Sequence, residues 1–403
     1  MNILFLTLAK IDTLSQRGLY QDLMREFSGH GHHLYIVSPT ERRENQKTSL
    51  KSEGNTKFLN VRTLNIQKTN FIEKGISTIS IEKLFLMSIK KYFSDVKFDL
   101  VIYSTPPITF TNVIKFIQKR DGAKTYLLLK DIFPQNAVDM QLMTKKGVLY
   151  KYFRNKEKEL YRISDKIGCM SKANADFILH QNSFISENKI EINPNSIELQ
   201  DFKELSEQER NTIKSQYKIP LDKKVFIYGG NLGKPQGIDF LIKTLDAKKD
   251  DERIFFIIVG SGTEYGKIKN WIDVTQPQNV FLLSALPKND YDLLVQVCDI
   301  GLIFLHKDFL IPNYPSRLLS YLEYKMPVIA ATDRNTDIGS DIVNNHCGVS
   351  VYSGDINDMT KTIDIFTEME SSKFEEMRQN SWDFLKKEFQ VKKSYEKIIN
   401  SLN

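Results

Sequence analysis

Residues 299–330 read DIGLIFLHKDFLIPNYPSRLLSYLEYKMPVIA, and this stretch decides the fold. The runs 301–305 and 327–331 are short and apolar, as strands buried on both faces are. Between them, leucines recur at helical spacing after Pro315 and Ser316, which suit a first turn and a cap. The order strand, helix, strand predicts a parallel βαβ unit. The loop before its helix lies at the carboxyl ends of the strands, where such sheets bind ligands.

Arg317 stands at the start of this expected helix. A cation beside free helix N–H groups favours a phosphate, so the stretch indicates a nucleotide-type ligand. For an isolated Pro-Ser-Arg, the alternative is an ordinary solvated arginine at a helix start. The rest of the chain has to decide between these two interpretations.

The same alternation of strands and helices runs through the whole chain. A polar, turn-rich stretch at 194–216 separates two sets of apolar runs that read as strands, at 2–8, 34–38, 99–104, 124–129, 166–170, 224–228, 254–259, 280–283, 300–305, 328–331 and 348–351. Alternation of this kind is typical of α/β folds with doubly wound parallel sheets. We therefore predict two Rossmann-like domains, at 1–195 and 196–380. A C-terminal helix at 381–403 is expected to pack back toward the first domain.

Length and composition agree with a globular protein of more than one domain. The 403 residues exceed the roughly 100–200 residues of a typical domain. No apolar run approaches the roughly 20 residues of a membrane-spanning helix, and the chain opens directly on a strand pattern without a leader. These features predict a cytoplasmic location. The three cysteines are far apart and read as reduced thiols, with neither a disulfide framework nor metal-ligand spacing.

Charge is distributed unevenly between the two halves. Residues 1–200 hold 30 Lys and Arg against 20 Asp and Glu, whereas residues 201–403 hold 26 against 30. The excess of positive charge therefore lies in the first half of the chain.

Two glycine-rich segments follow apolar runs in the second half. Residues 228–237 read YGGNLGKPQG, with Gly230, Asn231 and Lys234, and Gly260 and Ser261 follow the next run. Glycines at a strand end let backbone N–H groups approach a phosphate, and Lys234 could add charge. A tight structural turn explains the first segment equally well. Three candidate ligand loops in one half, however, support a phosphate site.

These segments together resemble a known family. The motifs YGGNLGKPQG, IIVGSG, NYPSRLLSYLEYKMPVIA and CGVSV are similar to the donor-binding half of bacterial family 4 glycosyltransferases of GT-B fold. In the first half, RGLYQDLMREFSGHGHHLYIVSP, KDIFPQNAVDM, CMSKANADFI and INPNSIELQDF resemble that family in the expected order. The resemblance implies two Rossmann-like domains that face a central cleft. The likeness is strongest to transferases of capsule and O-antigen synthesis, including those that move N-acetyl-L-fucosamine from its UDP form.

The resemblance also implies a metal-independent reaction that retains the anomeric configuration, with a UDP-sugar as co-substrate and no cofactor. The triplet Asp290-Tyr291-Asp292 is the one feature that suggests a divalent ion, because metal-dependent sugar transferases use such a triplet. It precedes apolar residues at helical spacing, so acids in a first helical turn are the favoured interpretation. Without a metal, cations and N–H groups must stabilise the pyrophosphate leaving group.

The chain departs from the family at the usual cations and carboxylates. Asn231 and Gln236 stand where many members carry Arg and Lys, and Pro312 and Ser320 stand where many carry two Glu residues. We therefore expect Arg317 to take over the diphosphate role, with Lys234 assisting. Glu323 is a candidate ribose contact, with a solvent-facing helix residue as the alternative. The expected donor-binding residues are Gly230, Asn231, Lys234, Gly260, Ser261, Ser316, Arg317, Ser320 and Glu323.

The first half carries the expected acceptor residues. Asp131 follows an apolar strand and is a candidate catalytic residue beside Arg317, because it could orient or deprotonate the acceptor hydroxyl. A carboxylate that caps the next turn is the alternative. Lys130 stands where the family often has His. Arg17 and Gly18, at the start of the first helix, correspond to a loop that meets acceptor or diphosphate.

Residues 143–172 combine positive charge with aromatic side chains. They hold nine cations against three acids, interleaved with Leu149, Tyr150, Tyr152, Phe153, Leu160 and Tyr161. Such a face can adsorb to anionic lipid, and a helix packed on its own domain is the alternative. The resemblance favours membrane contact, because an undecaprenyl-diphosphate-linked sugar acceptor would be met there. We expect a peripheral location on the inner face of the cell membrane and no nucleic-acid partner.

The sequence therefore predicts a glycosyltransferase of capsular or O-antigen synthesis. Two other functions stay open. A sugar-nucleotide epimerase could share the two-domain fold, but its acid/base carboxylates and His cannot be placed here. A non-catalytic partner of another transferase would explain the missing Glu pair and cations.

Overall fold

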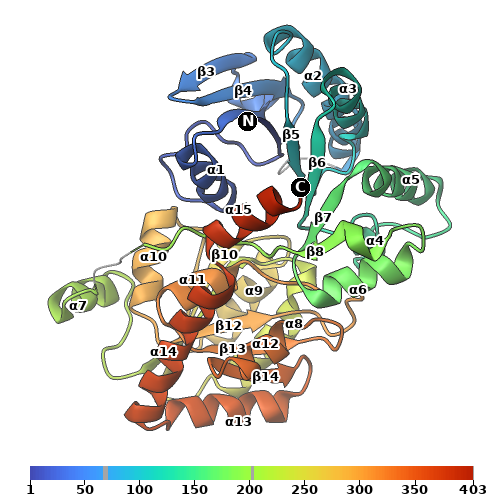
Figure 1. Cartoon of the computed structure of the whole chain (residues 1–403). Helices are drawn as coiled ribbons and strands as arrows, with labels where there is room; N and C mark the ends of the chain where they lie inside the picture. Colours follow the sequence, from blue (N-terminus) through green and yellow to red (C-terminus); the bar gives the residue numbers. More distant parts are fainter. Residues whose placement is uncertain (67–70, 201–203, 403) are drawn as a thin grey trace. The chain divides into compact units, whose positions relative to one another are not determined.

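The computed structural model describes residues 1–66, 71–200 and 204–402. The chain forms two compact units, coloured along the sequence in Figure 1. The first unit comprises Met1–Glu198 and Gln390–Asn403, and the second comprises Leu199–Phe389. The chain thus leaves the first unit after Glu198 and returns to it at Gln390, whereas the sequence predicted boundaries after residues 195 and 380.

The first unit is built on an eight-stranded sheet with the order β3-β4-β2-β1-β5-β6-β7-β8. Only the β3–β4 pair is antiparallel. The strands are β1 (Asn2–Leu6), β2 (His33–Glu41), β3 (Ser49–Glu53), β4 (Thr56–Thr63), β5 (Leu100–Ser104), β6 (Lys124–Leu129), β7 (Lys166–Cys169) and β8 (Ile190–Ile192). The expected strands of this half are present, and β3, β4 and β8 are additional.

Helices cover both faces of this sheet. One face packs against α1 (Leu19–Gly29) and α15 (Val391–Asn400), which lie side by side in Figure 1. Phe5 and Leu128 of the sheet share a core with Phe27 of α1 and Ile398 of α15. Other helices of the unit are α2 (Phe71–Tyr92), α3 (Thr111–Asp121), α4 (Gln135–Asp139), α5 (Val148–Ile163) and α6 (Lys172–Gln181).

The second unit is built on a six-stranded parallel sheet with the order β11-β10-β9-β12-β13-β14. Its strands are β9 (Lys224–Asn231), β10 (Ile254–Ser261), β11 (Val280–Leu283), β12 (Ile300–Phe304), β13 (Val328–Thr332) and β14 (Gly348–Tyr352). The side chains of β9, β10, β12 and β13 are buried on both faces over most of their length, as the apolar runs predict, whereas the edge strands β11 and β14 are largely half-buried. All six strands expected from the sequence are confirmed.

Helices also surround the second sheet (Figure 1). They are α7 (Glu207–Gln216), α8 (Ile238–Ala247), α9 (Tyr265–Thr275), α10 (Lys288–Gln296), α11 (Arg317–Glu323), α12 (Ile338–Asn344), α13 (Ile356–Thr367) and α14 (Ser371–Glu388). The helices α8, α9 and α13 share the core of one sheet face. The expected turn-rich boundary was wrong over 207–216, because Ser206 and Glu209 form a capping box that starts α7 there.

In the part of the chain that the structure describes, no helix combines the length and the apolar character needed to cross a membrane. The three cysteines, Cys169, Cys298 and Cys347, are buried free thiols.

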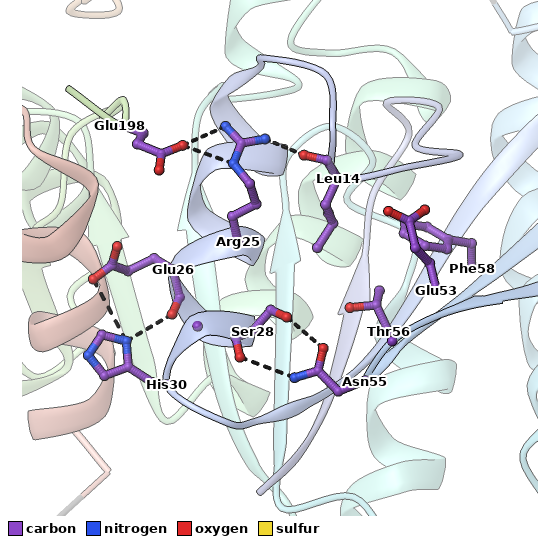
Figure 2. Close-up of a pocket in the computed structure, with 12 residues that line it drawn as sticks. Leu14, Arg25, Glu26, Ser28, His30, Glu53, Asn55, Thr56, Phe58 and Glu198 are labelled. Atoms are coloured by element: carbon purple, nitrogen blue, oxygen red, sulfur yellow. Dashed lines mark hydrogen bonds and ion pairs between the residues drawn. The ribbon is translucent and has the colours of Figure 1, made fainter. Parts of the chain in front are cut away.

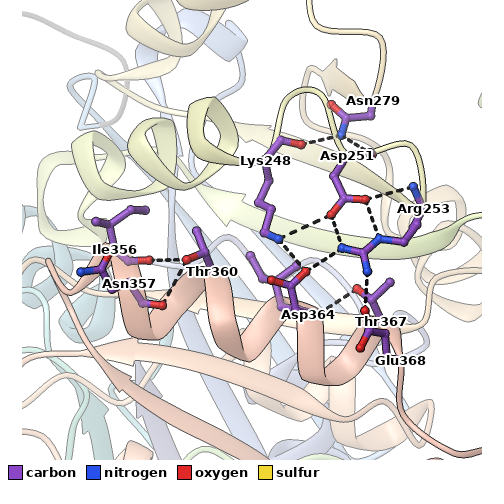
Figure 3. Close-up of polar contacts among 11 residues, drawn as sticks. Lys248, Asp251, Arg253, Asn279, Ile356, Asn357, Thr360, Asp364, Thr367 and Glu368 are labelled. Carbon is purple, nitrogen blue, oxygen red and sulfur yellow. Dashed lines mark hydrogen bonds and ion pairs between the residues drawn. The ribbon is translucent and has the colours of Figure 1, made fainter.

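An ion-pair network joins the start of β10 to α13 (Figure 3). Arg253 lies 2.7 Å from both Asp251 and Asp364, and Lys248 lies 2.6 Å from Asp364. Arg253 also pairs with Glu368 at 2.5 Å. The hydrogen bond from Arg253 is the main cause that lowers the pKa of Asp251 from 3.8 to about 2. The network therefore favours the ionised carboxylate in the folded state.

This shift predicts how stability depends on pH. A carboxyl whose pKa is depressed on folding stabilises the protein above its unfolded pKa of 3.8. That contribution is lost as the pH falls through the folded pKa of about 2. We expect Asp251→Asn to lower the free energy of unfolding by about 1–2 kcal/mol near neutral pH, with the difference disappearing in acid. Urea unfolding across the acid range measures this. The exposed Asp222→Asn is the control, and an equal loss at every pH would contradict the assignment.

Candidate functional site

The strand order of the second sheet reverses between β9 and β12. These strands pair only at Ile300 with Phe226 and at Gly301 with Ile227, and they separate beyond that point. In doubly wound sheets, ligands bind at the carboxyl ends of the strands where the order reverses. The residues around this opening are therefore the candidate site of the second unit.

Tyr321 of α11 fills the opening between the two strands. Its hydroxyl accepts a hydrogen bond from the Gly229 N–H at 3.1 Å. The same hydroxyl lies 3.2 Å from the carbonyl oxygens of Ile227 and Leu302, to which it can donate. Burial raises the pKa of Tyr321 to about 12, so the proton stays on the hydroxyl. One side chain thus replaces the missing sheet hydrogen bonds.

Glycines make room for this arrangement. A β-carbon at Gly301 would collide with the Tyr321 ring, and one at Gly229 would collide with the Tyr291 hydroxyl. Gly230 has φ of 117°, a conformation that favours glycine. The expected glycine turns are in fact strand: Gly229 and Gly230 belong to β9, and Gly260 belongs to β10. Close packing explains Gly229 and Gly260, for which the sequence offered either phosphate contact or a tight turn.

Arg317 meets the first glycine segment. Its Nη2 donates a hydrogen bond to Gln236 Oε1 at 2.5 Å, and its guanidinium carbon lies 4.2 Å from the centre of the Tyr228 ring. A β-carbon at Gly230 would lie 3.8 Å from the same guanidinium. Within the described part of the chain, Nη1 of Arg317 is buried without a hydrogen-bond partner. A guanidinium held in this way offers one unused N–H group to a bound anion.

The other residues expected to bind the donor differ in their exposure to solvent. Asn231 at the end of β9, Lys234, Ser261 and Ser316 are exposed, whereas Gly260 is buried and Ser320 is half-buried. Lys234 lies in the short 3₁₀ helix η3 (Lys234–Gln236).

Two expectations about α11 need correction. Ser316 occupies the N-cap position in a helical backbone conformation, and its side chain makes no capping hydrogen bond. The solvent-facing alternative for Glu323 is wrong, because that side chain is only 3 % exposed. Packing of α11 against α14 explains the burial of Glu323.

The Asp290-Tyr291-Asp292 triplet lies in the first half of α10, as the helical interpretation predicted. Lys288 donates to the Asp292 carboxylate at 2.5 Å, so this acid is paired within its own helix. No cluster of three His, Cys, Asp or Glu side chains that could hold a metal ion occurs among the residues described.

In the first unit, the ends of β5 and β6 meet at the expected acceptor residues. Thr105 Oγ1 accepts hydrogen bonds from the backbone N–H groups of Lys130 at 3.0 Å and Asp131 at 3.1 Å. Asn136 Nδ2 donates to both carboxylate oxygens of Asp131 at 2.8 Å. Helix α4 begins after Pro134, so Asp131 is not the N-cap residue of that helix.

Lys130 points into the interior of the first unit. Its ammonium donates to the carbonyl oxygen of Asn193 at 3.2 Å. Burial lowers the pKa of Lys130 from 10.5 to about 7. The expected acceptor-binding residue Lys130 therefore has a pKa far below that of an exposed lysine.

Charged residues hold the loop at Arg17 and Gly18. Gly18 precedes α1 as its N-cap, and its N–H donates to Asp22 at 3.1 Å. Arg25 donates to Asp22 at 2.5 Å and to Glu198 at 2.9 Å, as Figure 2 shows for Glu198. Arg17 Nη2 lies 3.4 Å from the Glu198 carbonyl oxygen. The start of α1 is thus fastened to the end of the first unit.

Figure 2 also shows a pocket beside α1. Its volume is about 620 Å³, and its lining includes Glu26, Glu53 and Glu198. Arg25 in the same wall is neutralised by its two carboxylate partners. None of the residues expected from the sequence to bind donor or acceptor lines this pocket.

Sequence reasoning missed the aromatic part of the site in the second unit. Arg317 and the opening between β9 and β12 are surrounded by Tyr228, Tyr291 and Tyr321. Gln236 holds the guanidinium in place. A signal existed only for Tyr321, which follows Arg317 by four residues and therefore shares its helix face.

Comparison with known proteins indicates the class of enzyme. Residues 209–382 match the family model "Glycosyl transferases group 1". The chain is 21 % identical over 305 residues to the probable glycosyltransferase WbjE of Pseudomonas aeruginosa, covering 76 % of this chain and 74 % of that one. It is 22 % identical over 251 residues to WcaI of Escherichia coli (strain K12), which is named for colanic acid biosynthesis, covering 60 % and 59 % of the two chains.

Solved structures resemble the whole chain. A sucrose-phosphate synthase from Thermosynechococcus elongatus has a TM-score of 0.76 at 12 % identity, over 99 % of this chain and 98 % of that one. HepE from Anabaena, in complex with UDP and glucose, has a TM-score of 0.72 at 13 % identity, over 100 % and 99 %. These likenesses show the two-domain GT-B fold.

A substitution at Tyr321 tests whether its hydroxyl stabilises the opening between β9 and β12. Tyr321→Phe keeps the ring but leaves the buried Gly229 N–H without its acceptor, and leaving a buried group unpaired costs about 1–3 kcal/mol. We expect the free energy of unfolding to fall by that amount in urea titrations. Tyr352→Phe, at a side chain that is 40 % exposed, is the matched control. Equal stability of the two variants would show that the hydroxyl bridge contributes nothing.

Proposed function

Because the chain is a glycosyltransferase of GT-B fold, we propose that its second unit binds a UDP-sugar and its first unit binds the acceptor. The favoured reaction moves N-acetylfucosamine from UDP-N-acetyl-L-fucosamine to a lipid-diphosphate-linked saccharide in capsular or O-antigen synthesis. The sugar keeps its anomeric configuration, and no metal takes part. WcaI, named for colanic acid biosynthesis, supports a role in polysaccharide assembly.

The observation that carries this proposal is the unused N–H group of Arg317 at the crevice. Departure of UDP places negative charge on its diphosphate, and a fixed cation that faces this charge lowers the barrier. Arg317 is fixed by Gln236 and by the Tyr228 ring. Lys234 and backbone N–H groups near Gly230 would add to the stabilisation.

On the acceptor side, Asp131 would orient or deprotonate the attacking hydroxyl. Thr105 holds the backbone of this residue, and Asn136 holds its carboxylate. Lys130, Arg17 and Gly18 would complete the acceptor site. A lysine whose pKa is lowered to about 7 could gain a proton when an anionic acceptor binds beside it.

The segment 142–152 is the proposed membrane contact of the first unit. Leu142, Val148, Leu149 and Tyr152 are 60 %, 85 %, 43 % and 38 % exposed, although all are apolar or aromatic. Lys145, Lys146 and Lys151 are exposed among them, and the segment has no acid. The other aromatic face of α5 is buried, with Phe153, Leu160 and Tyr161 in the core. The exposed end is therefore suited to anionic lipid.

A donor panel tests the reaction. Candidate UDP-sugars are incubated with and without an undecaprenyl-diphosphate-linked sugar, and products are identified by mass spectrometry. Donor consumption that requires the acceptor supports the proposal. Interconversion of the donor without acceptor would favour the epimerase, and no turnover of any donor would favour the non-catalytic partner.

Arg317→Ala should weaken UDP binding by about 10- to 100-fold, because a charge-assisted hydrogen bond contributes about 1.5–3 kcal/mol. Arg317→Lys should recover only part of this loss, since an ammonium lacks the planar fork of the guanidinium. Isothermal titration calorimetry measures both affinities. Arg253→Ala, before the amino end of β10, is the control and should bind UDP normally. Unchanged affinity and turnover in Arg317→Ala would remove this residue from the site.

Removing the charges of the segment 142–152 should weaken membrane binding. Each lysine near an anionic surface contributes about 1 kcal/mol, so Lys145→Gln, Lys146→Gln and Lys151→Gln together should lower binding by about 100-fold. Co-sedimentation with phosphatidylglycerol-containing vesicles measures it, and pure phosphatidylcholine vesicles give the baseline. The matched control replaces the exposed Lys83, Lys90 and Lys91 of α2 by Gln. Equal losses in both triple variants would assign the binding to net charge alone.

A further inference from the structure

Two buried polar atoms without a partner lie on the loops that follow β12 and β13, and a third lies at the start of α11. They are Asn313 Nδ2, Arg317 Nη1 and Asp333 Oδ2, and none of them has a hydrogen-bond partner among the described residues. A buried polar group that stays unpaired is costly, and native structures keep few of them. A ligand that pairs with these atoms would explain why they persist.

Asn313 and Asp333 are joined through one residue, Thr336. Asp333 Oδ1 accepts hydrogen bonds from the N–H groups of Asn335 at 2.7 Å and Thr336 at 3.0 Å. Thr336 Oγ1 in turn donates to the Asn313 carbonyl oxygen at 2.5 Å. The turn after β13 therefore holds the loop after β12 in place.

A second contact ties the same two segments together. Asn335 Nδ2 donates to the Phe309 carbonyl oxygen at 2.8 Å. Further along, the Tyr314 hydroxyl donates to Asp341 at 2.9 Å. The backbone on both sides of Asn313 is thus anchored. Asp333 is only 4 % exposed, and its two backbone contacts at Oδ1 fix the direction of Oδ2.

The chemistry of the three atoms differs in a way that suggests the ligand. A carboxylate oxygen accepts a hydrogen bond, an amide N–H donates one, and a guanidinium N–H favours an anion. A sugar hydroxyl can donate and accept at once, and in a glycosyl diphosphate the hydroxyls lie close to phosphate. These three atoms therefore match a glycosyl diphosphate better than a simple anion, because a simple anion has no hydroxyl to donate to the carboxylate.

We propose that Asn313 and Asp333 bind hydroxyl groups of the donor's glycosyl unit and thereby select among donor sugars. This inference rests on the proposed function, since it assumes a UDP-sugar with its diphosphate near Arg317. A site that hydrogen-bonds a sugar hydroxyl rejects analogues that lack it, because its own buried groups are then left unpaired.

Electrostatics agrees with this assignment. Burial raises the pKa of the Asp333 carboxyl, whereas its hydrogen bonds from Asn335 and Thr336 act in the opposite direction. A sugar hydroxyl that donates to Oδ2 would favour the charged form further. Donor binding should therefore offset part of the free-energy cost of burying the Asp333 carboxylate.

The test separates the sugar from the nucleotide. UDP, UDP-glucose, UDP-N-acetylglucosamine, UDP-N-acetylgalactosamine and UDP-N-acetyl-L-fucosamine are titrated into the full chain and into the nearly isosteric variants Asn313→Asp and Asp333→Asn. We expect UDP affinity to stay within about 2-fold, while the additional affinity of the preferred UDP-sugar falls by about 10- to 100-fold. The order of preference within the panel should also change. Asn211→Asp and Asp273→Asn, on exposed parts of α7 and α9, are the matched controls.

Each other outcome has a definite meaning. Equal losses for UDP and for every UDP-sugar would show that the two residues only hold the loops, and the inference would be wrong. Unchanged sugar preference in both variants would also overturn it, leaving buried water as the partner of these atoms. Failure of the unaltered chain to bind any of the nucleotides would overturn the proposed function itself, which the variants alone cannot do.

Discussion

The separation of β9 from β12 is the constraint on which the second unit depends. Two parallel strands that part in the middle of a sheet leave backbone N–H and carbonyl groups that must be satisfied. Tyr321 meets this need with one hydroxyl, next to the Gly229 N–H and two carbonyl oxygens. Gly301 and Gly229 lack side chains because Tyr321 and Tyr291 occupy the space. Aromatic side chains packed on glycines therefore maintain the separation of β9 and β12.

The position of the cation follows from that of the crevice. Arg317 and Tyr321 are four residues apart on α11, so they project from the same face of the helix. Gln236 and the Tyr228 ring restrain the guanidinium from the other side. A side chain that is already restrained loses little conformational entropy when a ligand binds, so more of its interaction energy reaches the ligand. Arg317 is therefore the better restrained candidate for contact with the diphosphate.

Elements whose side chains are buried on both faces were predicted from the sequence. Elements that depend on contacts with other segments of the chain were missed. Central strands of both sheets are continuous apolar runs, so their existence was readable. The edge strand β3 is exposed along its whole length, and β8 has only three residues, so neither gives an apolar signal. For the site, Arg317 could be found as a cation at a helix start. The Tyr321 bridge and the burial of Glu323 could not, because both depend on contacts between segments distant in sequence.

The two units use cations of different kinds, and this difference follows from residue type and burial. Arg317 keeps its charge throughout the physiological pH range, even when buried among tyrosines. Lys130 is a buried amine whose pKa falls to about 7, because its single backbone acceptor, the Asn193 carbonyl, does not offset the loss of water. In the proposed reaction, Arg317 would face the diphosphate with a charge that is always present. Lys130 would instead gain a proton in response to the charge of a bound acceptor, while Asp131 would act on the acceptor hydroxyl.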